Sequence, residues 1–205
     1  MNLLLETALE TRRSVKNFKP DETLSRATLD RLMDLTRRTP TAYNLQNWRA
    51  IAVTSPEAKA RLRAMAFDQS QIEEAAVTFI MVGNTDGYRQ IGQRLEPSVS
   101  AGIMPQGVAN AWVDMVNGSH GTNPILRRDE AFRSASLAAM TLMFAAETLG
   151  LGSGGVSGFE PDRVHDAFEL AEGEVPVVLV CIGTAMTNNW SQKPRLPVSQ
   201  IYSQL

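Results

Sequence analysis

Residues 128–150 read RDEAFRSASLAAMTLMFAAETLG, and this stretch decides the fold more than any other part of the chain. It runs for about 20 residues, and its small and apolar side chains cover nearly the whole circumference of a helix. Gly150 follows the last turn as a helix stop. The stretch therefore predicts a long, central helix that is buried on most sides.

Apolar runs on both sides of this helix predict the strands of a sheet. AVTFIMVG, residues 76–83, and VPVVLVCIG, residues 175–183, predict buried strands, and residues 49–54 predict a shorter one. Helical patterns with start and stop signals cover residues 2–12, 26–38, 55–66 and a short segment that begins at Pro161. Because helices and strands alternate irregularly, we expect one α+β or mixed α/β domain over residues 1–205.

Two segments have weaker patterns. Prolines interrupt residues 84–128 around the apolar piece VANAWVDMV, which predicts helices and loops that cover a site. Residues 184–205 predict a polar, proline-containing tail. The sequence shows no internal repeat and no low-complexity run.

Composition excludes several classes of protein. The formal net charge of −2 and the pI of about 5.8 argue against general nucleic-acid binding, which needs a basic surface. One cysteine, Cys181, precludes an internal disulfide, and two histidines leave little for a metal site. The first residues read as a helix and not as a signal peptide, and no apolar run reaches about 20 residues. We therefore expect a cytoplasmic protein that binds no metal, membrane or nucleic acid.

The single cysteine and the two histidines each have an expected setting. Cys181 lies within an apolar strand, which predicts a buried structural thiol. His165 is expected in a short surface helix, where it is solvated. Ser119 and Gly121 flank His120, which predicts a mobile loop that can line an entrance.

Basic residues cluster near each end of the chain. RRSVK, residues 12–16, brings three cations and a hydroxyl together, and guanidinium forks match the oxygens of a phosphate. The alternative is that these cations only complement a helix C-terminus. In QKPRLP, residues 192–197, Lys193 and Arg195 point to one face of an extended chain. The alternative there is a solvated tail.

Two further segments are rich in amides and in glycine. TAYNLQNW, residues 41–48, presents three amide side chains that can meet the donors and acceptors of a heteroaromatic ring. Its alternative is a turn capped by Asn44, with Trp48 in the core. GLGSGGVSGF, residues 150–159, has five glycines in nine positions, and its backbone N–H groups can hold an anion or a carbonyl-rich ring. Its alternative is a helix stop followed by a flexible connection.

In their order along the chain, these segments resemble the nitroreductase family of FMN-dependent oxidoreductases. The matching pieces are RRSVKNF, PTAYNLQNW, the glycine-rich segment that ends SGF, and KPRLP. RRDEAFRSASLAAM also resembles the central helix of a bacterial branch of NAD(P)H nitroreductases. The resemblance spans almost the whole chain and implies an α+β fold. It further implies a central mixed sheet flanked by helices, and an intertwined homodimer with two FMN molecules in clefts at the interface.

The resemblance also implies roles for individual residues. In one subunit, the first basic cluster holds the phosphate and the pyrimidine side of the flavin, and the tail cations complete the phosphate clamp. Ser157 and Gly158, near the end of the glycine-rich segment, lie beside the isoalloxazine, with a backbone N–H near flavin N5. Gln69, or else Asp68, contacts the flavin ring, and the loop that contains Gln46 comes from the partner chain. The implied FMN-binding residues are Arg12, Arg13, Ser14, Lys16, Thr41, Ala42, Asn44, Gln46, Gln69, Ser157, Gly158, Lys193 and Arg195.

Two positions depart from the family pattern. Asn47 stands where many members have proline, which predicts a less rigid loop. Ser157 stands where many relatives carry an acid, which affects the geometry expected for the nicotinamide.

The implied activity is hydride transfer from NADH or NADPH to flavin N5, followed by reduction of a nitroaromatic or quinone in a ping-pong cycle. The flavin carries the chemistry, so no catalytic side chain is required, and Lys16 is expected to stabilise the reduced, anionic flavin. One alternative is dehalogenation or flavin destruction on the same fold. Another is a non-catalytic flavin-binding or dimeric interaction protein. The sequence specifies neither the physiological acceptor nor the preferred nucleotide.

Overall fold

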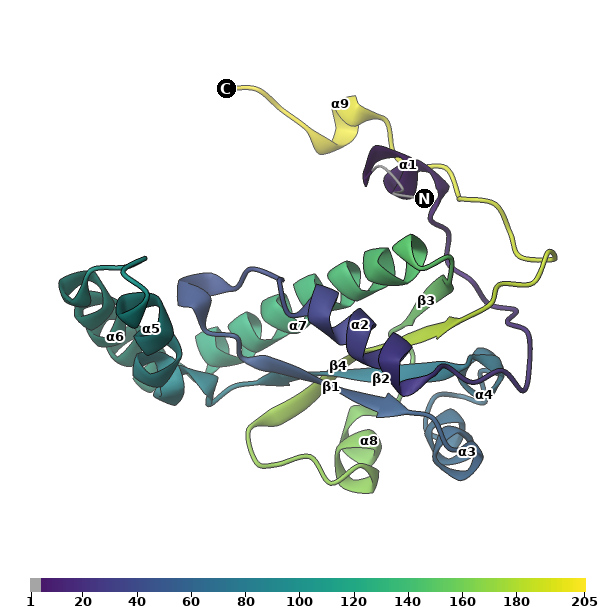
Figure 1. Ribbon diagram of the computed structural model, residues 1–205, viewed down its shortest axis with the longest axis horizontal. Helices are drawn as coiled ribbons and strands as arrows, with labels where there is room; N and C mark the ends of the chain where they lie inside the picture. The colour runs from purple at the N-terminus through teal and green to yellow at the C-terminus, as the bar shows by residue number, and fades with distance from the viewer. Residues whose placement is uncertain (1–4) are drawn as a thin grey trace.

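The computed structural model describes residues 5–205, so residues 2–4 of the first expected helix lie outside the described residues (Figure 1). The strands are β1 (Trp48–Val53), β2 (Val77–Asn84), β3 (Gly152–Val156) and β4 (Glu174–Gly183). The helices are α1 (Leu5–Thr11), α2 (Arg26–Thr36), η1 (Ala42–Asn44), α3 (Pro56–Ala64), α4 (Gln71–Glu74), η2 (Gly87–Gln90), α5 (Ile91–Ser100), α6 (Gln106–Gly121), α7 (Pro124–Thr148), α8 (Pro161–Ala167) and α9 (Val198–Ile201).

The four strands form one sheet in the order β1-β2-β4-β3, and every pairing is antiparallel. The expected mixed sheet is therefore wrong for the described chain. The parallel contact that is present is an isolated bridge between Ser14 and Ser153, where the N-terminal segment crosses the edge strand β3. The fold is α+β, as expected.

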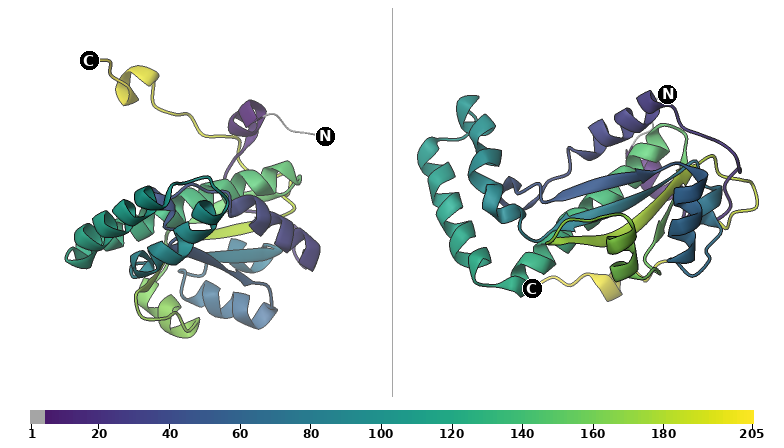
Figure 2. Two further views of the ribbon diagram at one scale, coloured as in Figure 1. Left: turned by 60° about the vertical axis from the view of Figure 1, so that its left-hand side comes forward. Right: turned by 90° about the horizontal axis from the view of Figure 1, so that it is seen from below.

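Helices cover both faces of the sheet (Figures 1 and 2). On one face, α2 and α7 bury the side chains of Phe79, Met81 and Val180. On the other face, α3, α4 and α8 pack against Ile80 and Leu179. Neighbouring residues of β2 and β4 thus enter opposite cores, which explains why both strands are continuous apolar runs in the sequence.

Helix α7 confirms the prediction of a long, central helix, and it begins earlier than expected. The predicted burial on most sides is wrong for the single chain, because only the face toward the sheet is buried and Leu137 is 49% exposed. Pro124 occupies its first turn, and the side chain of Asn123 accepts a hydrogen bond from the Leu126 backbone N–H. Its buried positions are mainly alanine and serine, so the helix lies close to the sheet. A Cβ added to Gly83 of β2 would stand 2.6 Å from the carbonyl oxygen of Ala131. Gly150 ends the segment with a φ of 72°, as its position predicts.

The segment 84–128 is mostly helical, and α5 and α6 form a hairpin at one end of the molecule (Figures 1 and 2). The hairpin has a core of its own around Tyr88, Leu95 and Val116. The prediction of a mobile loop at His120 is wrong, because this residue lies in α6 and is 5% exposed. Its ring stacks on Tyr88 with the ring centroids 6.0 Å apart, a contact that its polar sequence neighbours do not indicate.

The glycine-rich segment is also more regular than expected. Residues 152–156 form the edge strand β3 instead of an open loop, and their backbone pairs with β4 from Gly183 to Leu179. The alternative of a flexible connection after the helix stop is therefore wrong for residues 152–156. The segment leaves the sheet at Ser157. The backbone N–H groups that can still bind a ligand are therefore those on the edge of β3 that faces away from β4 and those of Ser157 and the residues after it.

Candidate functional site

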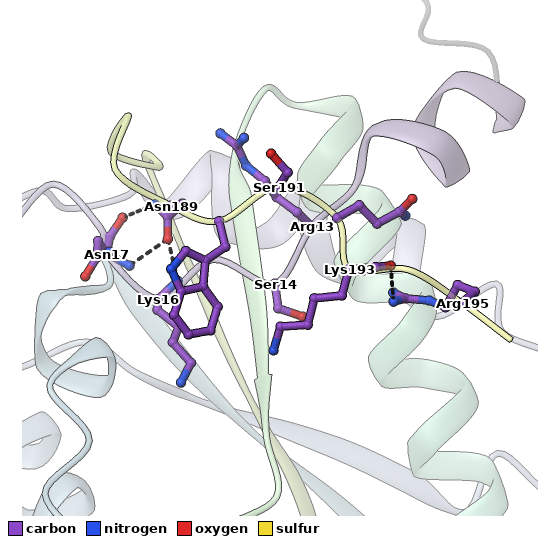
Figure 3. A pocket seen from close by; sticks show the side chains of 10 residues that line it. Arg13, Ser14, Lys16, Asn17, Asn189, Ser191, Lys193 and Arg195 are labelled. Carbon is purple, nitrogen blue, oxygen red and sulfur yellow. Dashed lines mark hydrogen bonds between the residues drawn. The ribbon is translucent and has the colours of Figure 1, made fainter.

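A pocket of about 310 Å³ lies where the N-terminal segment and the C-terminal tail meet (Figure 3). The segment after α1 supplies one wall and the tail before α9 supplies the other. Its lining residues are Arg13, Ser14, Lys16, Asn17, Asn189, Trp190, Ser191, Gln192, Lys193 and Arg195. The two basic clusters of the sequence, about 180 positions apart, therefore meet in one site, as the implied phosphate clamp requires.

The electrostatics of this pocket favour an anion. Arg13, Lys16, Lys193 and Arg195 line it, and no carboxylate does. Within residues 5–205, none of these four cations makes an ion pair, although most other arginines of the chain do. Four cations gathered without a counter-ion repel one another, so a bound dianion such as a phosphate would relieve that repulsion.

The individual cations are held to different degrees. The Lys16 and Lys193 ammonium groups lie 5.8 and 5.0 Å from the ring centroid of Trp190. Arg195 donates to the carbonyl of Lys193 at 2.7 Å, which turns its guanidinium back along the tail (Figure 3). The Ser14 hydroxyl has no hydrogen-bond partner in the described part of the chain and is exposed, so it remains available to a ligand oxygen.

Sequence reasoning missed half of the lining, namely Asn17, Asn189, Trp190, Ser191 and Gln192. The missed residues bind the two segments to each other. Asn189 makes four hydrogen bonds to the backbone, three of them to Lys16 and Asn17. Only the position of TNNWSQ next to KPR in the sequence could have indicated them.

Arg12 does not line the pocket. Its backbone carbonyl accepts a hydrogen bond from the Gln192 side chain at 3.1 Å, so its observed contact with the tail is through the main chain. The structure thus separates Arg12 from the three other expected residues of the N-terminal cluster, Arg13, Ser14 and Lys16.

Gln69 and Gly158 come together at a second place. The Gln69 side chain donates to the carbonyls of Ala66 and Gly158 at 2.9 and 2.8 Å, which engages both of its amide hydrogens. The preceding residues Phe67 and Asp68 adopt left-handed backbone angles with φ of 53° and 54°, and the Asp68 side chain is exposed. In this arrangement Gln69 fixes the segment that follows β3.

Ser157 lines a separate hollow of about 540 Å³ at the end of β3, together with Phe159 and Arg128. Between this hollow and the cationic pocket runs the exposed backbone of Gly155, where an added Cβ would meet no atom within 4 Å. A planar ligand therefore has room to approach β3 along this edge.

The loop with Thr41, Ala42, Asn44 and Gln46 lies at the opposite end of the sheet. Trp48 pairs with Gly83, which pairs with Val175 at the start of β4, whereas Ser14 contacts Ser153, which pairs with Ile182 near its end. Seven residues of strand separate the two positions, or about 23 Å. One chain therefore does not bring this loop to its own cationic pocket.

The loop itself is pre-shaped. Tyr43, Asn44 and Gln46 have left-handed backbone angles, and the Thr41 hydroxyl accepts a hydrogen bond from the Gln46 backbone N–H at 2.9 Å. The side chains of Asn44 and Gln46 are exposed and make no hydrogen bond in the described part of the chain. Asn47 is 3% exposed, and its backbone carbonyl and side chain both bind the main chain of Asn84. This anchor is the structural role of the residue that replaces proline.

Other expected settings can be compared with the structure. Cys181 is fully buried, as predicted, and burial raises the pKa of its thiol to about 12. Residues 5–205 contain no helix long and apolar enough to cross a membrane. The same residues contain no group of three or more His, Cys, Asp or Glu side chains placed to hold a metal ion.

Comparison with known proteins assigns this chain to a family. The model of the nitroreductase family matches residues 9–184. YodC of Bacillus subtilis, named as a candidate NAD(P)H nitroreductase, is 32% identical over 193 residues, which cover 94% of this chain and 95% of YodC. The DrgA protein of Synechocystis is 29% identical over 176 residues, or 86% of this chain and 81% of DrgA.

A solved structure extends the likeness to the fold. The crystal structure of a candidate nitroreductase from Exiguobacterium sibiricum in complex with FMN has a TM-score of 0.91 and 26% identity. The match covers 99% of this chain and 98% of that one. The chain therefore belongs to the nitroreductase family and has its α+β fold, a four-stranded sheet flanked by helices.

Proposed function

We propose that the chain is an FMN-dependent oxidoreductase that takes electrons from NADH or NADPH and reduces electron-poor small molecules such as nitroaromatics or quinones. The observation that carries the proposal is the pocket with four unpaired cations. A phosphate monoester of charge near −2 is the ligand that such a pocket fits, and FMN has one. The relative solved with FMN and the relatives named for NAD(P)H support the choice of ligand.

The rest of the flavin would follow β3. With its phosphate among Arg13, Ser14, Lys16, Lys193 and Arg195, the ring system would reach past the open backbone of Gly155 toward Ser157 and Gly158. Gln69, bonded to the Gly158 carbonyl, would hold the backbone there. Lys16 lines the pocket, and its ammonium would add a positive charge on the side of the flavin from which the ring extends, which stabilises an anionic form.

We further propose a homodimer in which Thr41, Ala42, Asn44 and Gln46 reach the flavin of the partner subunit. Their distance from the pocket of the same chain, together with exposed amides on a pre-shaped loop, supports this arrangement. Exposed apolar side chains near both ends of the chain also support it. In α1 and in the tail around α9, the side chains that are more than half exposed include Leu5, Leu9, Val198, Ile201 and Tyr202.

When bound, FMN supplies the redox chemistry, taking a hydride equivalent from the nicotinamide and delivering it to the acceptor. The contribution of the protein is to bind the phosphate, fix the ring and exclude competing reactions. The α5–α6 hairpin packs against Leu45 of the loop proposed to reach the partner's flavin, so we expect its exposed side chains, such as Ile103 and Met115, to shape the acceptor site beside that flavin.

Reconstitution with FMN tests the proposal. The protein should bind FMN, become yellow, and lose its visible absorbance when NADH or NADPH is added without oxygen. Lys193→Met should weaken FMN binding by about tenfold, a loss typical of a charge-assisted contact. Lys19→Met is the matched control, because Lys19 pairs with Glu22 outside the pocket.

Each failure of this experiment has a defined meaning. A protein that cannot be loaded with FMN rules out the proposed function and the flavin-binding alternative together. A yellow protein that neither nucleotide bleaches is the non-catalytic flavin protein. Equal FMN binding by both lysine variants means that the cationic pocket is not the phosphate site.

A further inference from the structure

The tail residue Asn189 makes more hydrogen bonds than any other side chain near the pocket. Its Oδ1 accepts from the backbone N–H groups of Lys16 and Asn17 at 2.8 and 2.9 Å. Its Nδ2 donates to the carbonyls of Asn17 and Met186 at 2.7 and 2.9 Å. Two donors converge on one amide atom and two acceptors on the other, so only one orientation of this amide satisfies all four partners.

These bonds fix the path of the tail. Before Asn189, the main chain already follows the N-terminal segment through the bonds Lys19 N–H to Thr184 O and Met186 N–H to Asn17 O. After it, the Gln192 side chain donates to the carbonyls of Leu9 and Arg12, both at 3.1 Å. The tail that leads to Lys193 is thus held against the N-terminal segment by two side chains, Asn189 and Gln192.

The consequence of this path is the position of Lys193. Trp190 follows Asn189 directly, and its indole lies within 5.8 Å of the Lys16 ammonium and 5.0 Å of the Lys193 ammonium. The indole is 67% exposed, so its two cation–π contacts are too weak to hold the lysines in place by themselves. Figure 3 shows both ammonium groups directed to the same side of the pocket.

The same bonds also change what the backbone can offer a ligand. The adjacent N–H groups of Lys16 and Asn17 point together, an arrangement that by itself attracts an anion. The Asn189 Oδ1 occupies both, so a ligand phosphate must be bound by the side chains. The Ser14 hydroxyl and the four cations then carry the recognition.

We infer that Asn189 is a positioning residue for the phosphate clamp, because its carboxamide docks the tail on Lys16–Asn17 and so places the Lys193 ammonium on the same side of the pocket as that of Lys16. This inference rests on the proposed function. Fixing the tail before the ligand arrives removes an ordering cost that would otherwise reduce affinity for the phosphate end alone. The oxidised ring system is uncharged and is expected beside Ser157 and Gly158, which make no hydrogen bond with Asn189 in the described residues, so its binding should not sense the loss of Asn189.

The test compares FMN with riboflavin, which lacks the phosphate, on Asn189→Ala and on Asn188→Ala. Asn188 is the adjacent exposed amide and makes no hydrogen bond in the part of the chain that the structure describes. Asn189→Ala should lower affinity for FMN by about tenfold and leave riboflavin affinity unchanged, whereas Asn188→Ala should alter neither. Equal loss for both ligands, or no loss for FMN, overturns the inference.

A double-mutant cycle separates positioning from general damage. If Asn189 acts through Lys193, then Lys193→Met should cost much less FMN affinity in the Asn189→Ala protein than in the wild type. Fully additive losses overturn the inference. Failure of the proposed function looks different: the wild-type protein would then bind neither FMN nor riboflavin. Failure of the inference concerns the Asn189→Ala protein, in a background where the wild type binds both flavins.

Limited trypsin digestion reads the docking of the tail without any flavin. The bond after Arg195 precedes Leu196, and in residues 5–205 the side chains that tie the tail before this bond to the N-terminal segment by hydrogen bonds are those of Asn189 and Gln192. Asn189→Ala should be cut there several-fold faster than Asn188→Ala. Equal cleavage rates mean that Asn189 does not dock the tail, whatever the flavin measurements show.

Discussion

Gln69 and Gly158 are 89 positions apart in the sequence, and a hydrogen bond of 2.8 Å from the Gln69 side chain to the Gly158 carbonyl joins them. The same amide nitrogen also donates to Ala66 at 2.9 Å, so it closes the loop that precedes it. That loop contains two consecutive non-glycine residues in the left-handed region, Phe67 and Asp68. Such backbone angles persist only where surrounding contacts enforce them.

Replacing Gln69 should therefore loosen both the loop and the end of β3. Gln69→Glu keeps the size of the side chain but turns a carboxylate toward two carbonyl oxygens, so we expect a loss of about 1–3 kcal/mol in the free energy of unfolding. Urea denaturation measures it. Gln200→Glu, in the exposed tail, is the control and should change stability little. Equal stabilities of the two variants would contradict the role given to this amide.

Arg49 and Glu174 predict how stability depends on pH. Arg49 donates to both carboxylate oxygens of Glu174 at 2.6 Å, from a strand that is not adjacent to β4 in the sheet. These bonds hold the pKa of Glu174 below its ordinary value of 4.5. A carboxylate with a lowered pKa in the folded state adds stability above its ordinary pKa, and that stability is lost as pH falls through the lowered value.

We therefore expect Glu174→Gln to reduce the free energy of unfolding by about 1–2 kcal/mol at pH 7, since Arg49 is half exposed and the pair is partly screened. The difference from the wild type should stay constant above about pH 5 and shrink as pH falls below about 4.5. Denaturant titrations between pH 3 and pH 7 would show this. A difference that is the same at all pH values would mean that the ion pair is not its source. Asp162→Asn removes an exposed carboxylate without an ion pair in the described chain and serves as the control.

The Cys181 thiol should be inert in the native protein. It lies between the sheet and the helices on one face, burial raises its pKa to about 12, and only about one molecule in ten thousand carries the thiolate at pH 8. An aromatic disulfide reagent should thus fail to react in native buffer and should titrate one thiol per chain in urea. Rapid modification of the native protein would show that this core opens far more often than its packing suggests.

The parts of the fold that were predictable are those whose side chains carry a local signal. The long helix has a nearly continuous apolar circumference, and β2 and β4 are apolar runs because each buries both faces. Strand β3 could not be predicted, since GSGGV offers almost no side chains whose alternation would reveal a strand. Its conformation comes from the backbone of β4 on one edge and from Val15 on the other.

The site shows the same division. Arginine and lysine clusters reveal themselves by type and spacing, so Arg13, Lys16 and Lys193 were found from the sequence. Asn189 was not, because an asparagine in a polar tail is ordinary until its four partners are known, and two of those partners are backbone N–H groups about 170 positions away. His120 was misplaced for a similar reason, since its stacking contact with Tyr88 comes from a distant part of the sequence.

Two neighbouring glycines of β3 give a final, matched prediction. A Cβ added to Gly154 would stand 2.3 Å from the Val15 carbonyl oxygen, whereas a Cβ added to Gly155 would meet nothing within 4 Å. Both residues have ordinary backbone angles, so only the crossing of the N-terminal segment distinguishes them. Because the obstructing atom belongs to the backbone, Gly154→Ala must push Val15 away from the edge strand and with it the adjacent Ser14 and Lys16.

We expect Gly154→Ala to lose about 1–3 kcal/mol in the free energy of unfolding, in the range of overpacked sites. Its affinity for FMN should fall by more than its affinity for riboflavin, which has no phosphate. Gly155→Ala should retain wild-type stability or gain slightly, because alanine restricts the unfolded chain. Thermal unfolding of both variants, and titration of Gly154→Ala with FMN and with riboflavin, measure these effects. If Gly154→Ala is as stable as Gly155→Ala and loses no more affinity for FMN than for riboflavin, the bridge between Ser14 and Ser153 does not position the N-terminal half of the cationic pocket, and the phosphate site must be organised by the tail alone.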